Sequence, residues 1–245
     1  MSDKLSTEIA AKMFQLAQSI GLMPPECQVV PAETDKCSKL LAFIDLRQYH
    51  ENILEACTVM KLFESFQNAL PVTEFLAQFG SPSDRGRWQT VSDRVRLSDP
   101  QKALLSQFRR KTNVLVLAGA WCGDCVSQCP IFDHFAVAAP LLNVRYLDRD
   151  AYPQVQDELL VNGGKRVPVV VFFSEDGHEV ARFGDRTLSK YRELMQQQTG
   201  ETCASGIVGA KDDAFACVIQ DWLDQFERVQ WMLRLSPRLR QKYGD

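Results

Sequence analysis

The sequence has 245 residues, of which 45% are hydrophobic and 24% are charged, a composition typical of an ordinary globular protein. The formal net charge of −3 gives no basic surface for nucleic acid, and no apolar run reaches the roughly 18 residues that cross a bilayer. The first residues are amphipathic and lack the pattern of a secretory signal. We therefore expect a cytoplasmic protein with mostly reduced cysteines and with neither a nucleic-acid nor a membrane partner.

The N-terminal extension, residues 1–59, is predicted to be mostly helical. Apolar side chains from Ile9 to Ile20 share one helical face, and Gly21 ends that helix. Residues 39–46 fit either a strand or a buried helical turn, because periodicity alone does not separate the two.

A helical lead-in is predicted over residues 60–111. An apolar stripe crosses its start, and a helix over 72–79 lies between a proline and a glycine. Residues 81–89 are rich in Ser, Pro and Gly and are expected to form a loop. Residues 98–108 predict another helix, with Ser98 as its N-cap.

The hydrophobic pattern changes after residue 112, and residues 112–200 predict one α/β domain. Residues 113–117 are continuously apolar, as in a strand buried on both faces. The predicted order is β-α-β-α-β-β-α, with the later elements at 119–139, 143–148, 153–164, 167–173, 178–183 and 187–198. The Asp176-Gly177 pair favours a hairpin turn, so the last two strands should be antiparallel.

The tail, residues 201–245, predicts a loop and then a strong helix. Its apolar stripe is expected to dock on the body of the protein and consists of Ile219, Trp222, Leu223 and Phe226. The basic residues from 236 to 245 are expected to form a solvated end.

The stretch GAWCGDCVSQCP, residues 119–130, carries three cysteines where a buried strand leads into a helix. Unpaired backbone N–H groups at a helix N-terminus stabilise an anion, so the thiolate of Cys122 should be favoured. The thiolate is the nucleophile of thiol–disulfide exchange. Cys125 follows nearly one turn later, and we expect it to resolve the mixed disulfide that Cys122 forms.

Cys129 lies about 40° from Cys125 around the helix axis and one turn deeper. A small buried residue is the favoured interpretation, and protection of Cys125 from overoxidation is the alternative. The other cysteines have no metal-ligand spacing and are interpreted as small buried residues or inert thiols, namely Cys27, Cys37, Cys57, Cys203 and Cys217.

A metal site is not expected in this stretch. Four ligands, or three and an open position, are needed for zinc, and His134 lies about 180° from Cys125 around the helix. His178 follows a turn and is expected to be exposed. We predict no metal and no cofactor.

Three features resemble the thioredoxin superfamily: WCGDC at 121–125, Pro130 one turn later, and VPVVVFF with Pro168 at the start of a strand. The resemblance covers about residues 100–200 and implies an α/β thioredoxin-like fold, a central mixed sheet flanked by helices. The N-terminal helical region and the helical tail would be additions. From Met60 onward the chain also resembles a bacterial group of thioredoxin-like proteins with a helical lead-in and tail.

The resemblance also implies residues that contact a substrate. Pro168 would be a cis-proline facing the cysteine pair, which costs only about 0.5–1 kcal/mol for an X-Pro bond, and the Val167 backbone would pair with an extended substrate. Gly184 matches a glycine that lets substrate approach, although a turn glycine needs no such role. Trp121 matches the aromatic residue beside the site, and packing explains it equally well.

Two positions depart from the thioredoxin pattern. Val116 stands where those proteins carry a buried aspartate, the proton acceptor for the resolving cysteine. Asp124 replaces the usual proline, and its negative charge should raise the pKa of Cys122. Both changes would modulate the dithiol chemistry without removing it.

The sequence as a whole predicts a thiol–disulfide oxidoreductase that acts on protein disulfides through Cys122 and Cys125. A reductase or a low-molecular-weight thiol would supply its electrons. The alternative is a thioredoxin-fold binding or adaptor module without efficient turnover.

Overall fold

The computed structural model describes residues 62–199 and 214–244, all within one unit, Leu54–Asp245. The predictions for residues 1–59 lie outside the described residues, as do those for Cys27, Cys37, Cys57 and Cys203. Among the described helices, none combines the length and the apolar character that crossing a membrane requires.

Four strands form a mixed sheet in the order β2-β1-β3-β4. β1 (Thr112–Ala118) is parallel to β2 (Leu142–Asp148) and antiparallel to β3 (Val169–Phe173), which pairs antiparallel with β4 (Glu179–Gly184). All residues of β1 are buried, as the continuous apolar run predicts. The predicted strands and hairpin are confirmed, and the fold is the expected α/β thioredoxin-like fold.

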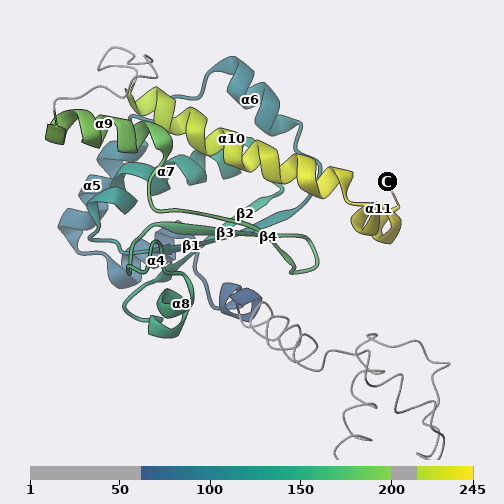
Figure 1. The fold of residues 1–245 in the computed structure, drawn as a ribbon, viewed down its shortest axis with the longest axis horizontal. Helices are drawn as coiled ribbons and strands as arrows, with labels where there is room; N and C mark the ends of the chain where they lie inside the picture. The colour runs from purple at the N-terminus through teal and green to yellow at the C-terminus, as the bar shows by residue number, and fades with distance from the viewer. Residues whose placement is uncertain (1–61, 200–213, 245) are drawn as a thin grey trace, which may run out of the picture. The chain divides into compact units, whose positions relative to one another are not determined.

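Helices cover both faces of this sheet. Figure 1 shows α7 and α10 on one side of the strands and α8 on the other. The helices after the lead-in are α7 (Gly123–Ala138), α8 (Pro153–Glu158), α9 (Leu188–Thr199), α10 (Ala214–Leu235) and α11 (Pro237–Tyr243). α8 ends earlier than predicted, because a turn at Val161–Gly164 follows it.

The described part of the lead-in starts with helical residues 62–67 and continues with α4 (Val72–Phe79), α5 (Pro82–Ser92) and α6 (Asp99–Ser106). α4 and α6 are confirmed, including the N-cap at Ser98. The predicted loop over 81–89 is wrong, since it forms most of α5. The side chain of Ser81 accepts the Asp84 backbone N–H, and the Asp84 carboxylate accepts the Ser81 N–H. This capping box starts a helix in residues whose composition favours a loop.

The end of the chain is largely exposed, as predicted, but it is also an ordered helix. Residues 237–243 form α11, which Ser236 caps and which buries Leu239. Arg238 and Lys242 both bind the carboxylate of Asp176, in the turn between β3 and β4. These ion pairs hold the pKa of Asp176 well below its usual range despite partial burial. The basic residues therefore fasten the end of the chain to the hairpin turn.

Consecutive residues of β3 point to opposite faces of the sheet. The Phe172 ring meets Phe226 of α10 at 5.0 Å between centroids, and the Phe173 ring meets Phe63 of the 62–67 helix at 5.4 Å. Gly177 of the hairpin has φ +85°, and a Cβ there would lie 2.6 Å from the Phe63 ring. The lead-in and the tail thus supply one apolar layer each.

The tail helix α10 packs against the body of the protein, as predicted. All four stripe residues are buried. Trp222 is fully buried, with its ring 4.6 Å from that of Phe132 in α7 and 5.0 Å from that of Phe183 in β4. Edge-to-face contacts of this kind add about 0.5–1.5 kcal/mol each to the free energy of burying aromatic area.

Candidate active site

The cysteine stretch lies where β1 leads into α7. Cys122 is the N-cap of the helix and is partly exposed, whereas Cys125 and Cys129 lie within the helix at 0% exposure. The three cysteines are free thiols, as is Cys217. Cys217 is exposed on α10, so the prediction of a buried residue is wrong there, and that of an inert thiol stays a prediction.

The fold brings Val167 and Pro168 to the cysteine pair. The peptide between them is cis, and the Cys122 thiol donates to the Val167 carbonyl across 3.7 Å. The Cys125 sulfur accepts the backbone N–H of Gly119 at 3.5 Å. The Cys122 thiol therefore faces the cis-proline loop, while the Cys125 thiol is bound to the backbone just after β1.

The thiols interact along the helix. Cys125 has side-chain hydrogen bonds with both Cys122 and Cys129. The contact with Cys125, followed by burial, raises the pKa of Cys122, and the N–H groups of Cys125 and Asp124 only partly offset this. Burial raises the pKa of Cys125 well above its usual range. The N–H groups at the helix N-terminus thus lower the pKa of Cys122, as predicted, but the contact with Cys125 and burial outweigh them in the reduced pair.

Asp124 is paired with a residue that sequence reasoning missed. Its carboxylate accepts two hydrogen bonds from the Arg186 guanidinium, from Nε at 3.0 Å and from Nη2 at 2.5 Å. A bidentate pair of this kind offsets much of the carboxylate charge. The backbone N–H of Asp124 lowers the pKa of Cys122, and the repulsion by its carboxylate stays a prediction. Arg186 lies 62 residues away, and no local pattern marks it.

Trp121 lies at the rim of the site and is 50% exposed. The Arg149 guanidinium lies over its ring, 5.4 Å from the centroid, and its Nε1 donates to Asp150 at 3.4 Å. Arg87 of α5 donates to the Trp121 carbonyl at 2.9 Å. Because half of the indole faces solvent, core packing does not account for this residue.

Gly184 meets the cis-proline loop directly. A Cβ there would lie 2.8 Å from the Pro168 carbonyl oxygen, so a close backbone approach within the sheet already requires glycine. The peptide from Gly184 to Asp185 is also cis. The close approach explains this glycine, and substrate approach remains a prediction.

The environment of Cys129 includes an acid on the same helix. Val116 is fully buried and pairs with Tyr146 of β2. The Tyr146 hydroxyl lies 3.1 Å from a carboxylate oxygen of Asp133 and 3.2 Å from the Cys129 carbonyl oxygen. Burial raises the pKa of Asp133 to about 7, with the hydrogen bond from Tyr146 opposing it. Its i,i+4 spacing from Cys129 is a signal that sequence reasoning could have used.

The two histidines in the described part of the chain, His134 and His178, form no hydrogen bond with the thiols. His134 pairs with Ser92 of α5 at 3.1 Å, and His178 is exposed. In the part of the chain that the structure describes, no three His, Cys, Asp or Glu side chains gather as metal ligands would.

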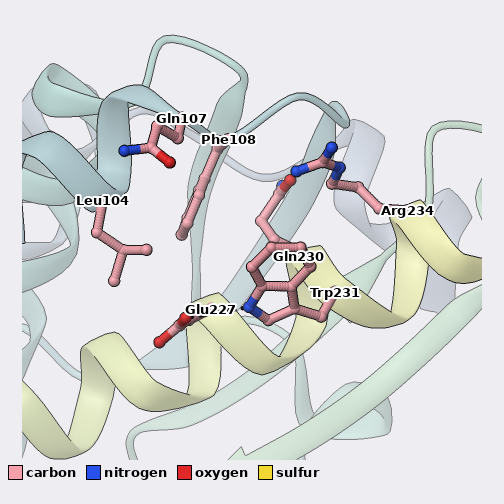
Figure 2. Close-up of a pocket in the computed structure, with 7 residues that line it drawn as sticks. All are labelled: Leu104, Gln107, Phe108, Glu227, Gln230, Trp231 and Arg234. Atoms are coloured by element: carbon pink, nitrogen blue, oxygen red, sulfur yellow. Dashed lines mark hydrogen bonds between the residues drawn. The ribbon is translucent and has the colours of Figure 1, made fainter.

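A pocket away from the cysteine pair lies where α10 packs against α6 and the segment after it. Figure 2 shows the seven residues that line it, from α6 and the segment after it and from α10. The Gln230 side chain accepts the backbone N–H groups of Arg109 and Arg110 and donates to Arg110 O and to Thr112 Oγ1. The amide thus fastens α10 to the segment that leads into β1.

Comparison with known proteins supports the thioredoxin-like fold. A family model described as thioredoxin matches residues 69–199. The crystal structure of a Pseudomonas aeruginosa protein of unknown function is 16% identical, covers 66% of this chain and 95% of its own, and has a TM-score of 0.53. Thioredoxin O2 from Arabidopsis thaliana in its oxidised state is 22% identical and covers 39% of this chain and 84% of its own, with a TM-score of 0.26. Fasciola hepatica thioredoxin is 24% identical and covers 40% of this chain and 90% of its own, with a TM-score of 0.26. No curated protein matches the chain.

Proposed function

The chain belongs to the thioredoxin family, whose model matches more than half of its residues, and from this premise we propose that it is a thiol–disulfide oxidoreductase. Its substrates would be protein disulfides, with Cys122 as the attacking thiol and Cys125 as the resolving one. Trp121, Val167, Pro168 and Gly184 would contact the substrate.

One observation carries the proposal: the partly exposed Cys122 thiol lies 3.7 Å from the Val167 carbonyl, beside a cis-proline. A substrate strand that pairs with the Val167 backbone would place its sulfur near Cys122. The buried Cys125 contacts Cys122 from within the helix. Access therefore favours attack by Cys122 and resolution by Cys125.

The exchange balances as follows. The Cys122 thiolate attacks one sulfur of the substrate disulfide, so a mixed disulfide forms and the other substrate sulfur leaves as a thiolate that takes up a proton. Cys125 then loses its proton and attacks the Cys122 sulfur, which releases the second substrate thiol. Two electrons pass from the dithiol to the substrate. A reductase or a low-molecular-weight thiol would reduce the Cys122–Cys125 disulfide again.

A binding or adaptor module remains the second candidate, because the pKa values of both thiols are raised. A small thiolate fraction at neutral pH slows nucleophilic attack. The fully buried Val116 offers no proton acceptor beside the pair. These features favour slow turnover without changing which sulfur attacks.

Trapping of the mixed disulfide tests the assignment. The Cys125→Ser variant of the full chain, mixed with a disulfide-bonded peptide, should accumulate a covalent adduct at Cys122 that dithiothreitol releases. Cys122→Ser should form no such adduct, and Cys129→Ser should turn over like the wild type. An adduct through Cys129, or none with any variant, would reject the proposed roles.

A further inference from the structure

Arginine side chains border the residues assigned to substrate contact. Arg149 lies over the Trp121 ring, and Arg87 donates to the Trp121 carbonyl. Arg166 immediately precedes Val167 and is exposed. Together with Arg186, which pairs with Asp124, four arginines contact or adjoin residues next to the cysteine pair, in a chain whose formal net charge is −3. We call these four residues the arginine rim.

Two carboxylates that pair with the rim, those of Asp185 and Asp84, are less exposed than their arginine partners. The Asp185 side chain is 3% exposed, whereas the Arg166 side chain that binds it is 45% exposed. The Asp84 side chain is 15% exposed, and its partner Arg87 is 45% exposed. The outer surface at these pairs is therefore cationic, although each pair is neutral. Asp124 and Arg186 are exposed to a similar extent.

Two other ion pairs, one of them formed by the rim member Arg149, are exposed on their acidic side. Asp150 binds Arg149, and Asp157 binds Lys165, with both carboxylates well exposed. Another cation, Arg85, donates to the Leu76 and Gly80 carbonyls and has no acid among these contacts. The guanidinium is thus the more exposed partner at Arg166 and Arg87, whereas at Arg149 the Asp150 carboxylate is the more exposed, at 62% against 22%.

The rim arginines retain donors for a ligand. A guanidinium has five N–H donors. The hydrogen bond from Arg166 to Asp185 uses one nitrogen, Nη1, at 3.2 Å. Arg149 uses Nε toward Asp150 and Nη1 toward the Lys165 carbonyl, so Nη2 remains. Free N–H groups of this kind suit carboxylates, which they bind with charge-assisted hydrogen bonds.

We propose that the disulfide substrate of this site is acidic, with carboxylates beside its reactive cysteine. This inference rests on the proposed function and adds the class of substrate. A chain paired with the Val167 backbone would carry residues on one side of its cysteine toward Arg166 and on the other toward Arg149 and Arg87. The exchange step itself is unchanged.

Three disulfide-bonded peptides that differ only in the residues flanking the cysteine test the inference on the full-length protein. With Glu, Gln or Lys at the flanks, kcat/KM for reduction should fall in that order, with about a tenfold span at low ionic strength. At about 0.5 M salt the span should shrink to about twofold, because screening weakens exposed charge pairs. Equal rates, or faster reduction of the Lys peptide, would overturn the inference.

Variants locate the effect. Arg166→Gln and Arg149→Gln should each reduce the Glu-over-Lys preference severalfold. Arg182→Gln is the matched control, because Arg182 is an exposed arginine of β4 paired with Glu179 and Glu158. If folded Arg166→Gln and Arg149→Gln both keep the full preference, the arginine rim is not its source.

Two small disulfides complete the experiment. Oxidised glutathione carries carboxylates without a long peptide chain, so its reduction at the rate of the Glu peptide would assign the preference to small acidic disulfides. Hydroxyethyl disulfide is neutral. If hydroxyethyl disulfide is reduced but the three peptides have equal kcat/KM values, only the substrate inference fails. If no disulfide is reduced, the proposed function fails as well.

Discussion

Trp121 and Trp222 represent two regions of the molecule with opposite surroundings. Trp121, at the N-terminal end of α7, is half exposed and lies under an arginine. Trp222 is fully buried against the body of the same helix and touches the rings of Phe132 and Phe183. α7 therefore has two parts: a more open N-terminal turn, where the partly exposed Cys122 is the N-cap, and a buried body that packs against α10.

One amide connects the two regions. The Trp222 indole N–H donates to the Gln128 side-chain oxygen at 3.1 Å. The Gln128 nitrogen in turn donates to the carbonyls of Asp124 and Asp185, at 3.2 Å and 3.1 Å. The tail helix therefore helps to position both the first turn of α7 and the segment after β4.

The largest expected effect separates the two tryptophans. Trp222→Ala should lower the free energy of unfolding by about 3–5 kcal/mol, because it leaves a cavity among aromatic side chains and removes the partner of Gln128. Trp121→Ala should change it by less than about 0.5 kcal/mol, since half of its surface is already in water. Urea denaturation measures both. Similar losses in the two variants would contradict the division of α7.

Asp133 gives the next largest effect, as a pH dependence. Its folded pKa of about 7 lies above the ordinary value of 3.8, so the folded state binds the proton more tightly. This contribution to stability is complete below pH 4 and is lost as the pH rises to 7. Asp133→Asn should gain about 4 kcal/mol relative to the wild type between pH 4 and pH 8, because each unit of pKa difference corresponds to about 1.4 kcal/mol.

Unfolding curves of the wild type and Asp133→Asn across this pH range check the prediction. The difference between the two proteins should grow steadily from pH 4 and level off above pH 7. A difference that stays constant with pH would show that Asp133 titrates normally. Asp157→Asn is a suitable control, because that carboxylate is well exposed.

The smallest effect concerns the open turn of α7. Arg186→Gln removes the bidentate partner of Asp124, so the unpaired carboxylate should raise the pKa of Cys122 further, by up to about one unit. Alkylation of Cys122 at pH 8, followed by mass spectrometry, should slow severalfold. The double variant with Asp124→Asn should recover the wild-type rate. An unchanged rate in Arg186→Gln would mean that Asp124 exerts no field on the thiol.

Local signals predicted most of the fold. The continuous apolar strands at 113–117 and 167–173 were predictable because burial on both faces leaves a clear pattern. α5 was missed because Ser81 and Asp84 act as a capping box in a segment whose composition favours a loop. α11 was missed although Ser236-Pro237 is a helix-start signal.

The candidate site was predictable only in part. The motif and the resemblance pointed to Cys122, Cys125 and Pro168, and the fold brings Cys122 to the cis-proline loop. The ion pair of Asp124 with Arg186 depends on β4 and the segment after it, so the tertiary structure was needed to reveal it. The thiol pKa values depend on burial and on contacts between the sulfurs. Neither can be predicted from the position of Cys122 at a helix N-terminus alone.

A redox titration of the full chain tests the central claim that Cys122 and Cys125 act as one two-electron pair. The protein is equilibrated in graded dithiol buffers, alkylated, and weighed by mass spectrometry. We expect two alkyl groups to appear together along a single transition, which Cys122→Ser and Cys125→Ser abolish and Cys129→Ser retains. If these two thiols never interconvert as a pair at any accessible potential, the oxidoreductase function is contradicted.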